Sequence, residues 1–183
     1  MTDAAAHPDL AYIAGLTRVR AAAGAVIQDE QGRVLLVRPT YKEGWLLPGG
    51  ALEPDESPLA ACRRELTEEI GFAPPLGGLL CVDWVPPRPP WDGGAMFLFD
   101  GGVFPPARIA EIRLPRAELD GFDFVAPGDL APRLIPRMVR RVTACLVRRG
   151  PGAVYLEDGA AVPAVSRAAP PHGGHCRAPG APC

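Results

Sequence analysis

The chain of 183 residues lacks an excess of charge of either sign, since 19 Lys and Arg residues stand against 21 Asp and Glu residues and the formal net charge is -2. Proteins that bind nucleic acid or a membrane surface mainly by electrostatic attraction carry a marked surplus of basic residues. The composition therefore gives no reason to expect nucleic acid or a membrane as a partner.

Long apolar runs are also missing, because the longest ones, such as residues 21–27, fall far short of the roughly 20 residues that span a bilayer. The first ten residues lack the basic and apolar regions of a signal peptide. The cysteines are odd in number and have no disulfide-framework spacing. We therefore expect a soluble protein of the reducing cytoplasm. The five cysteines are Cys62, Cys81, Cys145, Cys176 and Cys183.

Proline and glycine, by contrast, are abundant, with 23 and 21 residues. They divide the chain into short elements and concentrate in residues 85–94, which read as a loop, and in the tail from Pro163. The tail holds too few large apolar residues to order itself, so we expect disorder from about residue 163. The length fits one catalytic domain at 19–149, with an N-terminal extension at 1–18 and a C-terminal extension at 150–183.

Apolar periodicity between the two extensions predicts a mixed β-sheet covered by helices on its faces, which is an α/β fold. Ser57 as N-cap, Pro58 at the first helical position and Gly71 at the C-terminus delimit a helix at 58–70. A short turn at Gly32 predicts that strands at 19–28 and 33–38, on either side of it, form a hairpin. The remaining predicted elements are strands at 79–85, 95–100, 107–114 and 122–125 and a helix at 136–148.

The predicted helix at 58–70 carries a stripe of carboxylates. Glu65, Glu68 and Glu69 are spaced i, i+3, i+4 and share one face, while Leu66 and Ile70 occupy another. Adjacent like charges destabilise a bare helix, so a positive partner is expected opposite them. Taken alone, such a stripe is more often a solvated surface than a metal site. As a metal site, an all-oxygen set suits a hard cation such as Mg²⁺, whereas zinc would require histidine or cysteine at metal-ligand spacing.

The segment around this stripe resembles the Nudix box, the signature of the Nudix hydrolase family. From Gly50 to Phe72 the chain fits the pattern G-x(5)-E-x(7)-R-E-U-x-E-E-x-G-U, in which U is apolar, at every fixed position. The resemblance implies a Nudix-type α/β/α sandwich. The matching residues are Gly50, Glu56, Arg64, Glu65, Leu66, Glu68, Glu69, Gly71 and Phe72.

The resemblance also implies a role for each residue. Glu65, Glu68 and Glu69 would hold Mg²⁺, with Mn²⁺ as a substitute, and the backbone carbonyl of Gly49 or Gly50 would add a ligand. Arg64 would orient the glutamates. Glu56 would support the loop before the helix or remain solvated.

The activity implied is hydrolysis of a phosphoanhydride bond in a nucleoside diphosphate linked to another moiety, by attack of metal-activated water. The general base would be Glu68 in the box or Glu118, just before the predicted strand at 122–125. The alternative is a regulatory module that binds a nucleotide metabolite without hydrolysis, but all three box glutamates are retained, which favours catalysis. Relatives commonly form homodimers.

The substrate is less well specified by the sequence. Tyr41, Trp45, Trp84, Trp91 and Phe104 could stack on a base, although each is also suited to ordinary packing. Six arginines between residues 131 and 150 have no aromatic residue interleaved with them, so we interpret them as a solvated helix face.

Overall fold

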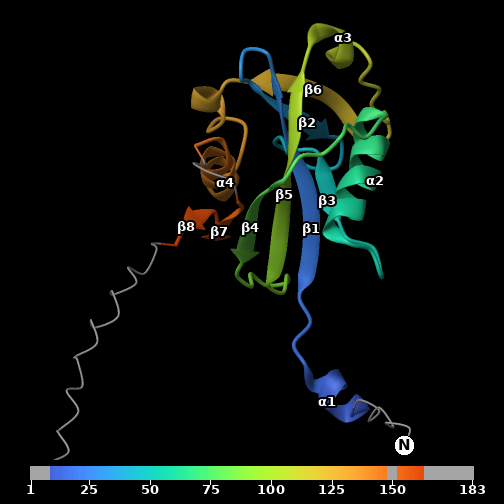
Figure 1. Cartoon of the computed structure of the whole chain (residues 1–183), viewed down its shortest axis with the longest axis vertical. Coiled ribbons are helices and arrows are strands. Elements are labelled where there is room, and N and C mark those ends of the chain that lie inside the picture. Colours follow the sequence, from blue (N-terminus) through green and yellow to red (C-terminus); the bar gives the residue numbers. More distant parts are fainter. Residues whose placement is uncertain (1–8, 148–151, 163–183) are drawn as a thin grey trace, which may run out of the picture.

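A computed structural model describes residues 9–147 and 152–162 of the chain. An eight-stranded sheet forms its centre, in the order β6-β2-β1-β5-β4-β7-β8, with β3 paired to β1 (Figure 1). The strands are β1 (Arg20–Asp29), β2 (Val34–Pro39), β3 (Gly49–Ala51), β4 (Leu79–Val85), β5 (Gly94–Phe104), β6 (Leu119–Val125), β7 (Val154–Glu157) and β8 (Ala160–Ala161). The helices are α1 (Leu10–Gly15), α2 (Pro58–Ile70), α3 (Pro106–Ile109) and α4 (Pro136–Leu146), with a 3₁₀ turn at Pro127–Asp129.

The predicted hairpin is confirmed, because β1 and β2 pair antiparallel around a tight turn. Asp29 organises this turn by accepting hydrogen bonds from the backbone N–H of Gln31 and of Arg33 and from the Arg33 side chain. Gly32 supplies the positive φ of 73° that the turn needs. On its other edge β1 pairs parallel with β5, so the sheet is mixed as expected.

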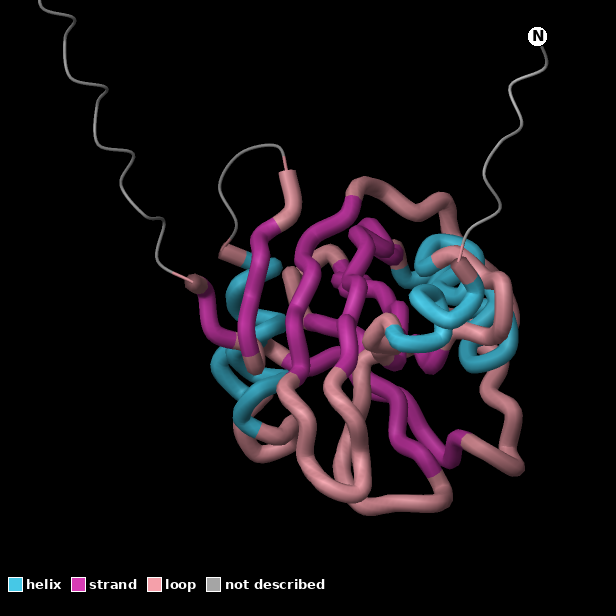
Figure 2. The backbone as a smooth tube through the Cα atoms, turned by 90° about the horizontal axis from the view of Figure 1, so that it is seen from below, coloured by secondary structure: helices cyan, strands magenta, loops and turns pink. Residues whose placement is uncertain are grey.

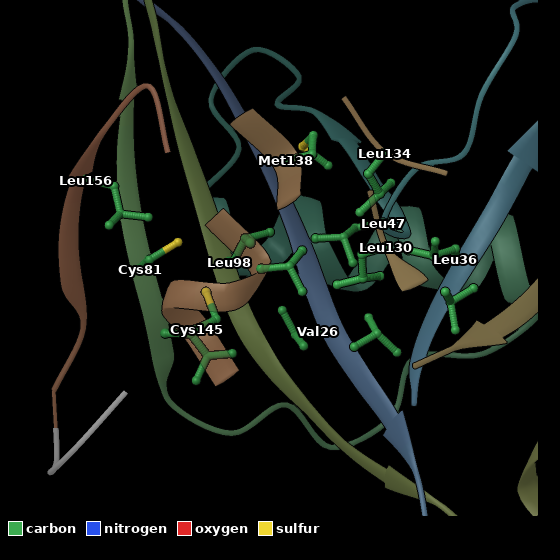
Figure 3. Packing of buried hydrophobic residues seen from close by; sticks show 14 residues of the cluster. Val26, Leu36, Leu47, Cys81, Leu98, Leu130, Leu134, Met138, Cys145 and Leu156 are labelled. Atoms are coloured by element: carbon green, nitrogen blue, oxygen red, sulfur yellow. The ribbon is translucent and has the colours of Figure 1, made fainter. Parts of the chain in front are cut away.

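Helices cover both faces of the sheet, which confirms the α/β/α sandwich (Figure 2). On one face the buried Cys62, Leu66 and Ile70 of α2 pack in a cluster that includes Ala25 and Ile27 of β1. A second cluster joins α4 to the opposite face and includes Val26, Leu98, Met138, Val142 and Cys145 (Figure 3). Each fully buried aliphatic side chain contributes about 1.5–3 kcal/mol, so both helices are held by the sheet.

Helix α2 begins and ends where local signals predict. The Ser57 hydroxyl accepts a hydrogen bond from the Ala60 backbone N–H at 3.2 Å, and Pro58 occupies the first turn. Gly71 ends the helix in the left-handed conformation, with φ 89°. The box glutamates are therefore fixed on a helix of defined length.

Three features differ from the sequence-based expectation. The strand predicted at 107–114 is wrong, because Pro105 and Pro106 start a one-turn helix, α3, whose chain then continues as a turn. Strand β5 extends past its predicted end to Phe104. Strands β7 and β8, inside the predicted C-terminal extension, were not anticipated, and β7 pairs parallel with β4.

Some expectations concern residues without structural description. Helix α4 is described to Leu146, and its predicted last residue, Arg148, lies outside the described residues. The tail for which disorder is expected begins at 163, also outside them. Among the described residues, no helix is long and apolar enough to cross a membrane. Cys62, Cys81 and Cys145 are buried thiols.

Candidate metal centre and active site

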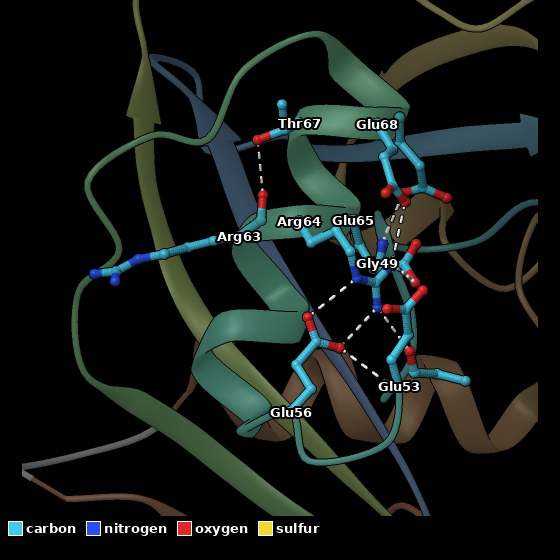
Figure 4. Close-up of polar contacts among 10 residues, drawn as sticks. Gly49, Glu53, Glu56, Arg63, Arg64, Glu65, Thr67 and Glu68 are labelled. Atoms are coloured by element: carbon cyan, nitrogen blue, oxygen red, sulfur yellow. Dashed lines mark hydrogen bonds and ion pairs between the residues drawn. The ribbon is translucent and has the colours of Figure 1, made fainter.

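Arg64 of α2 is the centre of the polar network in the Nudix box (Figure 4). Its guanidinium donates two parallel hydrogen bonds to Glu56, from Nε to Oε1 at 3.0 Å and from Nη2 to Oε2 at 2.9 Å. Nη1 donates to Glu65 at 2.9 Å and to Glu68 at 3.1 Å, and Nη2 also donates to the Ala51 carbonyl at 3.0 Å. One planar cation therefore fixes three carboxylates and β3, which agrees with the orienting role expected for Arg64.

Glu56 lies in the loop before α2 and links this loop to Arg64. Besides binding Arg64, it accepts a hydrogen bond from the backbone N–H of Glu53 at 3.0 Å. The Arg64 side chain, followed by this N–H, lowers the pKa of Glu56 below its usual value. Glu56 thus supports the loop before α2, one of the two roles left open by the sequence.

Glycines let the loop of the box approach the glutamates closely. The Gly49 backbone N–H donates a hydrogen bond of 2.7 Å to Oε2 of Glu69. A Cβ at Gly50 would meet the Glu65 carboxylate, and a Cβ at Gly49 would meet the backbone of Ala23 and Gly24. Only glycine fits at position 49, where φ is 137°, whereas a side chain at position 50 would displace the Glu65 carboxylate from its place in the site.

Two of the box carboxylates, Glu65 and Glu69, lie in an environment that disfavours their charged form. Burial, together with the negative charges of Glu65, Glu118 and Glu68, raises the pKa of Glu69 to about 8, although the Gly49 N–H acts in the opposite direction. Burial also raises the pKa of Glu65, against the influence of Arg64. A cation bound beside these two glutamates would relieve both effects.

Glu118 and Tyr41 complete this electrostatic cluster from outside the box. Glu118 is exposed at the end of the loop before β6, and its charge contributes to the raised pKa of Glu69. Burial and the charges of Glu69, Glu118 and Glu65 raise the pKa of Tyr41. Thr40 donates its backbone N–H to the Glu118 carbonyl at 2.8 Å, which ties the Tyr41 loop to β6. The sequence suggested Tyr41 only as a residue that could stack on a base, and gave no sign that it lies near the glutamates.

The remaining box residues are structural. Leu66 is fully buried in the core beneath α2. Phe72 packs against Phe104 with ring centroids 5.7 Å apart and lies under the Arg108 guanidinium. These contacts fasten the end of α2 to the sheet and to α3.

The donor atoms suit a hard cation. No group of three or more potential ligand side chains within the described ranges is closed around a metal position. Each of the three glutamates nevertheless keeps one oxygen without a hydrogen-bond partner among those residues: Oε2 of Glu65, Oε1 of Glu68 and Oε1 of Glu69. Three free carboxylate oxygens on one helix face fit Mg²⁺ in chemical type.

A cleft of about 330 Å³ lies beside the box, between the sheet and the start of α4. Ala51, whose carbonyl binds Arg64, lines it, as does Lys42, which follows Tyr41 in the loop. The floor is apolar and includes Leu46, Val85 and Met96. The cleft therefore borders the box at Ala51 of β3, whose carbonyl also accepts the hydrogen bond from Arg64.

The other sequence candidates are dispersed. Trp45 is partly buried between Arg38 and Arg133, Phe104 is in the core, and Trp91 is 65% exposed. The interpretation of the arginines as a solvated face is wrong for Arg141, which is 3% exposed. The Asp83 carboxylate binds it across 58 residues of sequence, a partner that no local pattern identifies.

Comparison with known proteins defines the family. Residues 18–145 match the model of the NUDIX domain, which is well over half of the chain. The chain therefore belongs to the NUDIX domain family, as its box indicated.

Curated relatives are similar over a shorter segment. An RNA pyrophosphohydrolase from Halorhodospira halophila is 41% identical over 51 residues, which is 28% of each chain. Diphosphoinositol polyphosphate phosphohydrolase 2 from Rattus norvegicus is 42% identical over 64 residues, covering 34% of this chain and 36% of the relative. The chain thus matches about a third or less of the length of these relatives.

Solved structures support the fold over more of the chain. The MutT protein from Methanosarcina mazei Go1 is 25% identical with a TM-score of 0.54, and the match covers 65% of this chain and 86% of that one. A MutT NUDIX hydrolase from Burkholderia pseudomallei is 24% identical with a TM-score of 0.57, covering 71% and 98%.

Proposed function

We propose that this chain is a Mg²⁺-dependent hydrolase of a phosphoanhydride bond in a nucleoside diphosphate linked to another moiety. The observation that carries the proposal is the trio of Glu65, Glu68 and Glu69 on one face of α2, each with a free carboxylate oxygen. Similarity to an RNA pyrophosphohydrolase and to a diphosphoinositol polyphosphate phosphohydrolase adds support, since both names describe cleavage of phosphorus anhydrides.

These three glutamates, with the backbone carbonyl of Gly49, would hold the metal. Bound Mg²⁺ neutralises pyrophosphate oxygens and lowers the pKa of a coordinated water, and Mn²⁺ would substitute for it. Arg64 keeps the Glu65 and Glu68 carboxylates in place, because its guanidinium is itself fixed by Glu56. A fixed donor set lowers the cost of reorganisation when charge develops on the reacting phosphate.

The proton of the attacking water requires a general base. Glu68 has a side chain that is 54% exposed and one free oxygen, so it can reach a water in the site. Glu118 is the second candidate, since it is exposed and its charge contributes to the raised pKa of Glu69. Glu118→Gln is the variant that decides between them, because loss of the base lowers kcat by about 100-fold to 10,000-fold, whereas Glu68→Gln also removes a metal ligand.

A regulatory module that binds a nucleotide metabolite without hydrolysis is the alternative function. The retained glutamates and the network around Arg64 favour catalysis, because binding alone does not require three carboxylates beside a polyanionic ligand. We further propose that the protein acts in the cytoplasm on a small molecule and not on nucleic acid or at a membrane, and that it forms a homodimer.

The test is release of phosphate or of a nucleoside monophosphate from a panel of nucleoside triphosphates, sugar nucleotides, ADP-ribose and dinucleotides. Each compound is assayed with Mg²⁺, with Mn²⁺ and with a chelator. We expect release from one class, abolished by chelator and by Glu69→Gln, with the circular dichroism of the variant unchanged. Tight binding of one nucleotide without release from any compound would favour the regulatory module.

A further inference from the structure

The cleft beside the box is bordered by positive charge. Arg20, Lys42 and Arg137 line it, and Asp92 is the only acidic residue among the described ones that line it. Arg20 lies 3.7 Å from Asp92, a loose pair in which both side chains are mostly exposed. The fourth cation, Arg141, is neutralised below the cleft by Asp83. The rim therefore carries more positive than negative charge.

Two of these cations form no close ion pair within the described ranges, although Arg88, Arg140 and Arg137 together lower the pKa of Asp158 and so share this one carboxylate. Neither Lys42 nor Arg137 forms an ion pair with any residue in that part of the chain, although Arg88 and Arg140 beside them both bind Asp158. Arg137 is half-buried, so its charge is less screened than that of an exposed side chain. Arg137 also lines two further hollows that adjoin the cleft, one below Trp91 and one beside Asp158.

The floor of the cleft indicates what does not bind there. It consists of aliphatic side chains and Met96, and none of its described lining residues is aromatic. A nucleobase held by stacking would require an aromatic face, and the exposed Trp91 and Tyr41 do not line this cleft. The cleft therefore suits a compact moiety with apolar surface and a negative group at its edge.

We propose that this cleft binds the second, non-reacting moiety of the substrate, and that this moiety carries a phosphate or carboxylate recognised by Arg137 and Lys42. The inference rests on the proposed hydrolase function and specifies its substrate class. The reacting pyrophosphate would lie at the glutamates, while the anionic group would reach the start of α4. Arg137 and Lys42 approach that group from α4 and from the Tyr41 loop, on two sides of the cleft.

The experiment compares ligands that differ by one negative group. UDP-glucose and UDP-glucuronate differ by a carboxylate, and NADH and NADPH differ by a phosphate. Dissociation constants are measured by calorimetry on the full-length Glu69→Gln variant in low salt with Mg²⁺, so that the pyrophosphate does not face uncompensated carboxylates and binding is separated from turnover. We expect the anionic member of at least one pair to bind about 10-fold more tightly, as for a charge-assisted hydrogen bond. Which pair responds identifies carboxylate or phosphate as the recognised group.

Arg137→Ala should remove most of this preference, and Lys42→Ala should reduce it. Arg63→Ala is the control, since Arg63 is an exposed arginine that does not line the cleft and projects away from the network in Figure 4. Equal affinity within both pairs, or no measurable binding of any of the four up to roughly 1 mM, would overturn the inference. An equal loss for both members of a pair in Arg137→Ala would also overturn it. Absence of metal-dependent hydrolysis, by contrast, would refute the hydrolase and leave the binding preference standing.

Discussion

Asp83 of β4 and Arg141 of α4 form a fully enclosed ion pair, with Oδ2 of Asp83 2.7 Å from Nε and 2.5 Å from Nη2 of Arg141. The side chains are 0% and 4% exposed. The other oxygen, Oδ1, accepts a hydrogen bond of 2.9 Å from the backbone N–H of Gly159 in the turn between β7 and β8. One carboxylate thus joins the sheet, a covering helix and the C-terminal hairpin.

Asp83→Ala should destabilise the fold strongly, because it leaves the buried Arg141 charge without a partner. We expect a loss of about 3–5 kcal/mol in the free energy of unfolding, measured by urea denaturation. Asp120→Ala is the control, since it removes an ion pair with Arg38 in which both side chains are about half exposed. That pair should contribute less than about 1 kcal/mol. Similar losses in the two variants would contradict the proposed importance of burial.

Gly159→Ala should loosen the C-terminal hairpin. Gly159 has φ 77°, and an added Cβ would meet the Arg137 carbonyl. A left-handed conformation alone costs a non-glycine residue about 1–2 kcal/mol, so a total loss near 2 kcal/mol is expected by thermal unfolding. Gly128→Ala should be nearly neutral, because a Cβ added there would meet no atom within 4 Å and the φ of Gly128 is not positive. An unchanged melting temperature in Gly159→Ala would show that the turn can rearrange without cost.

The stability of the metal-free protein should fall as the pH rises from about 4.5 to about 8. The pKa of Glu69 is raised to about 8 from an ordinary value of 4.5, so between these values the folded state binds more protons than the unfolded state. The contribution of Glu69 to stability is then fully present below pH 4.5 and is lost progressively up to pH 8, by at most about 1.4 kcal/mol as the pH rises by one. Glu69→Gln should flatten this part of the profile. A profile identical to that of the wild type would show that Glu69 is not responsible.

Arg64→Lys should impair catalysis although the charge is retained. Lysine cannot reproduce the two parallel hydrogen bonds to Glu56 together with those to Glu65 and Glu68. We expect the Mg²⁺ concentration for half-maximal activity to rise, or kcat to fall, by about 10-fold to 100-fold. Arg63→Lys on the same helix should behave as the wild type. In a cycle with Glu56→Gln the effects should be strongly non-additive, because the two side chains act together. Additive effects would mean that Glu56 does not position Arg64.

The part of the fold that the sequence predicts is the part governed by local signals. Helix α2 is bounded by Ser57, Pro58 and Gly71, each of which acts within one turn of the helix end. The apolar residues of 107–114 suggested a strand. That interpretation was wrong because the two prolines before the segment impose a helical turn. Local propensity outweighed the pattern of hydrophobicity in that segment.

The features that the sequence does not reveal depend on distant partners. The segment of β7 is only four residues long, and it becomes a strand because it pairs with β4, some 70 residues earlier. Arg141 gives no sign of burial until Asp83 is placed opposite it. The glutamates of the box were identified from their spacing together with the resemblance to the Nudix box, whereas the cleft needs side chains from β1, β4, β5 and α4.

Both partners of Asp83 lie far downstream in the sequence, which determines when this carboxylate can be buried during synthesis. As the ribosome releases β4, neither partner of this carboxylate has been synthesised, since Arg141 follows 58 residues later and Gly159 76 residues later. A carboxylate without partners resists burial, so that edge of the sheet cannot close until the last hairpin emerges. Pairing of residues 154–161 with β4 would therefore be a late step of co-translational folding, after the Nudix box has been synthesised.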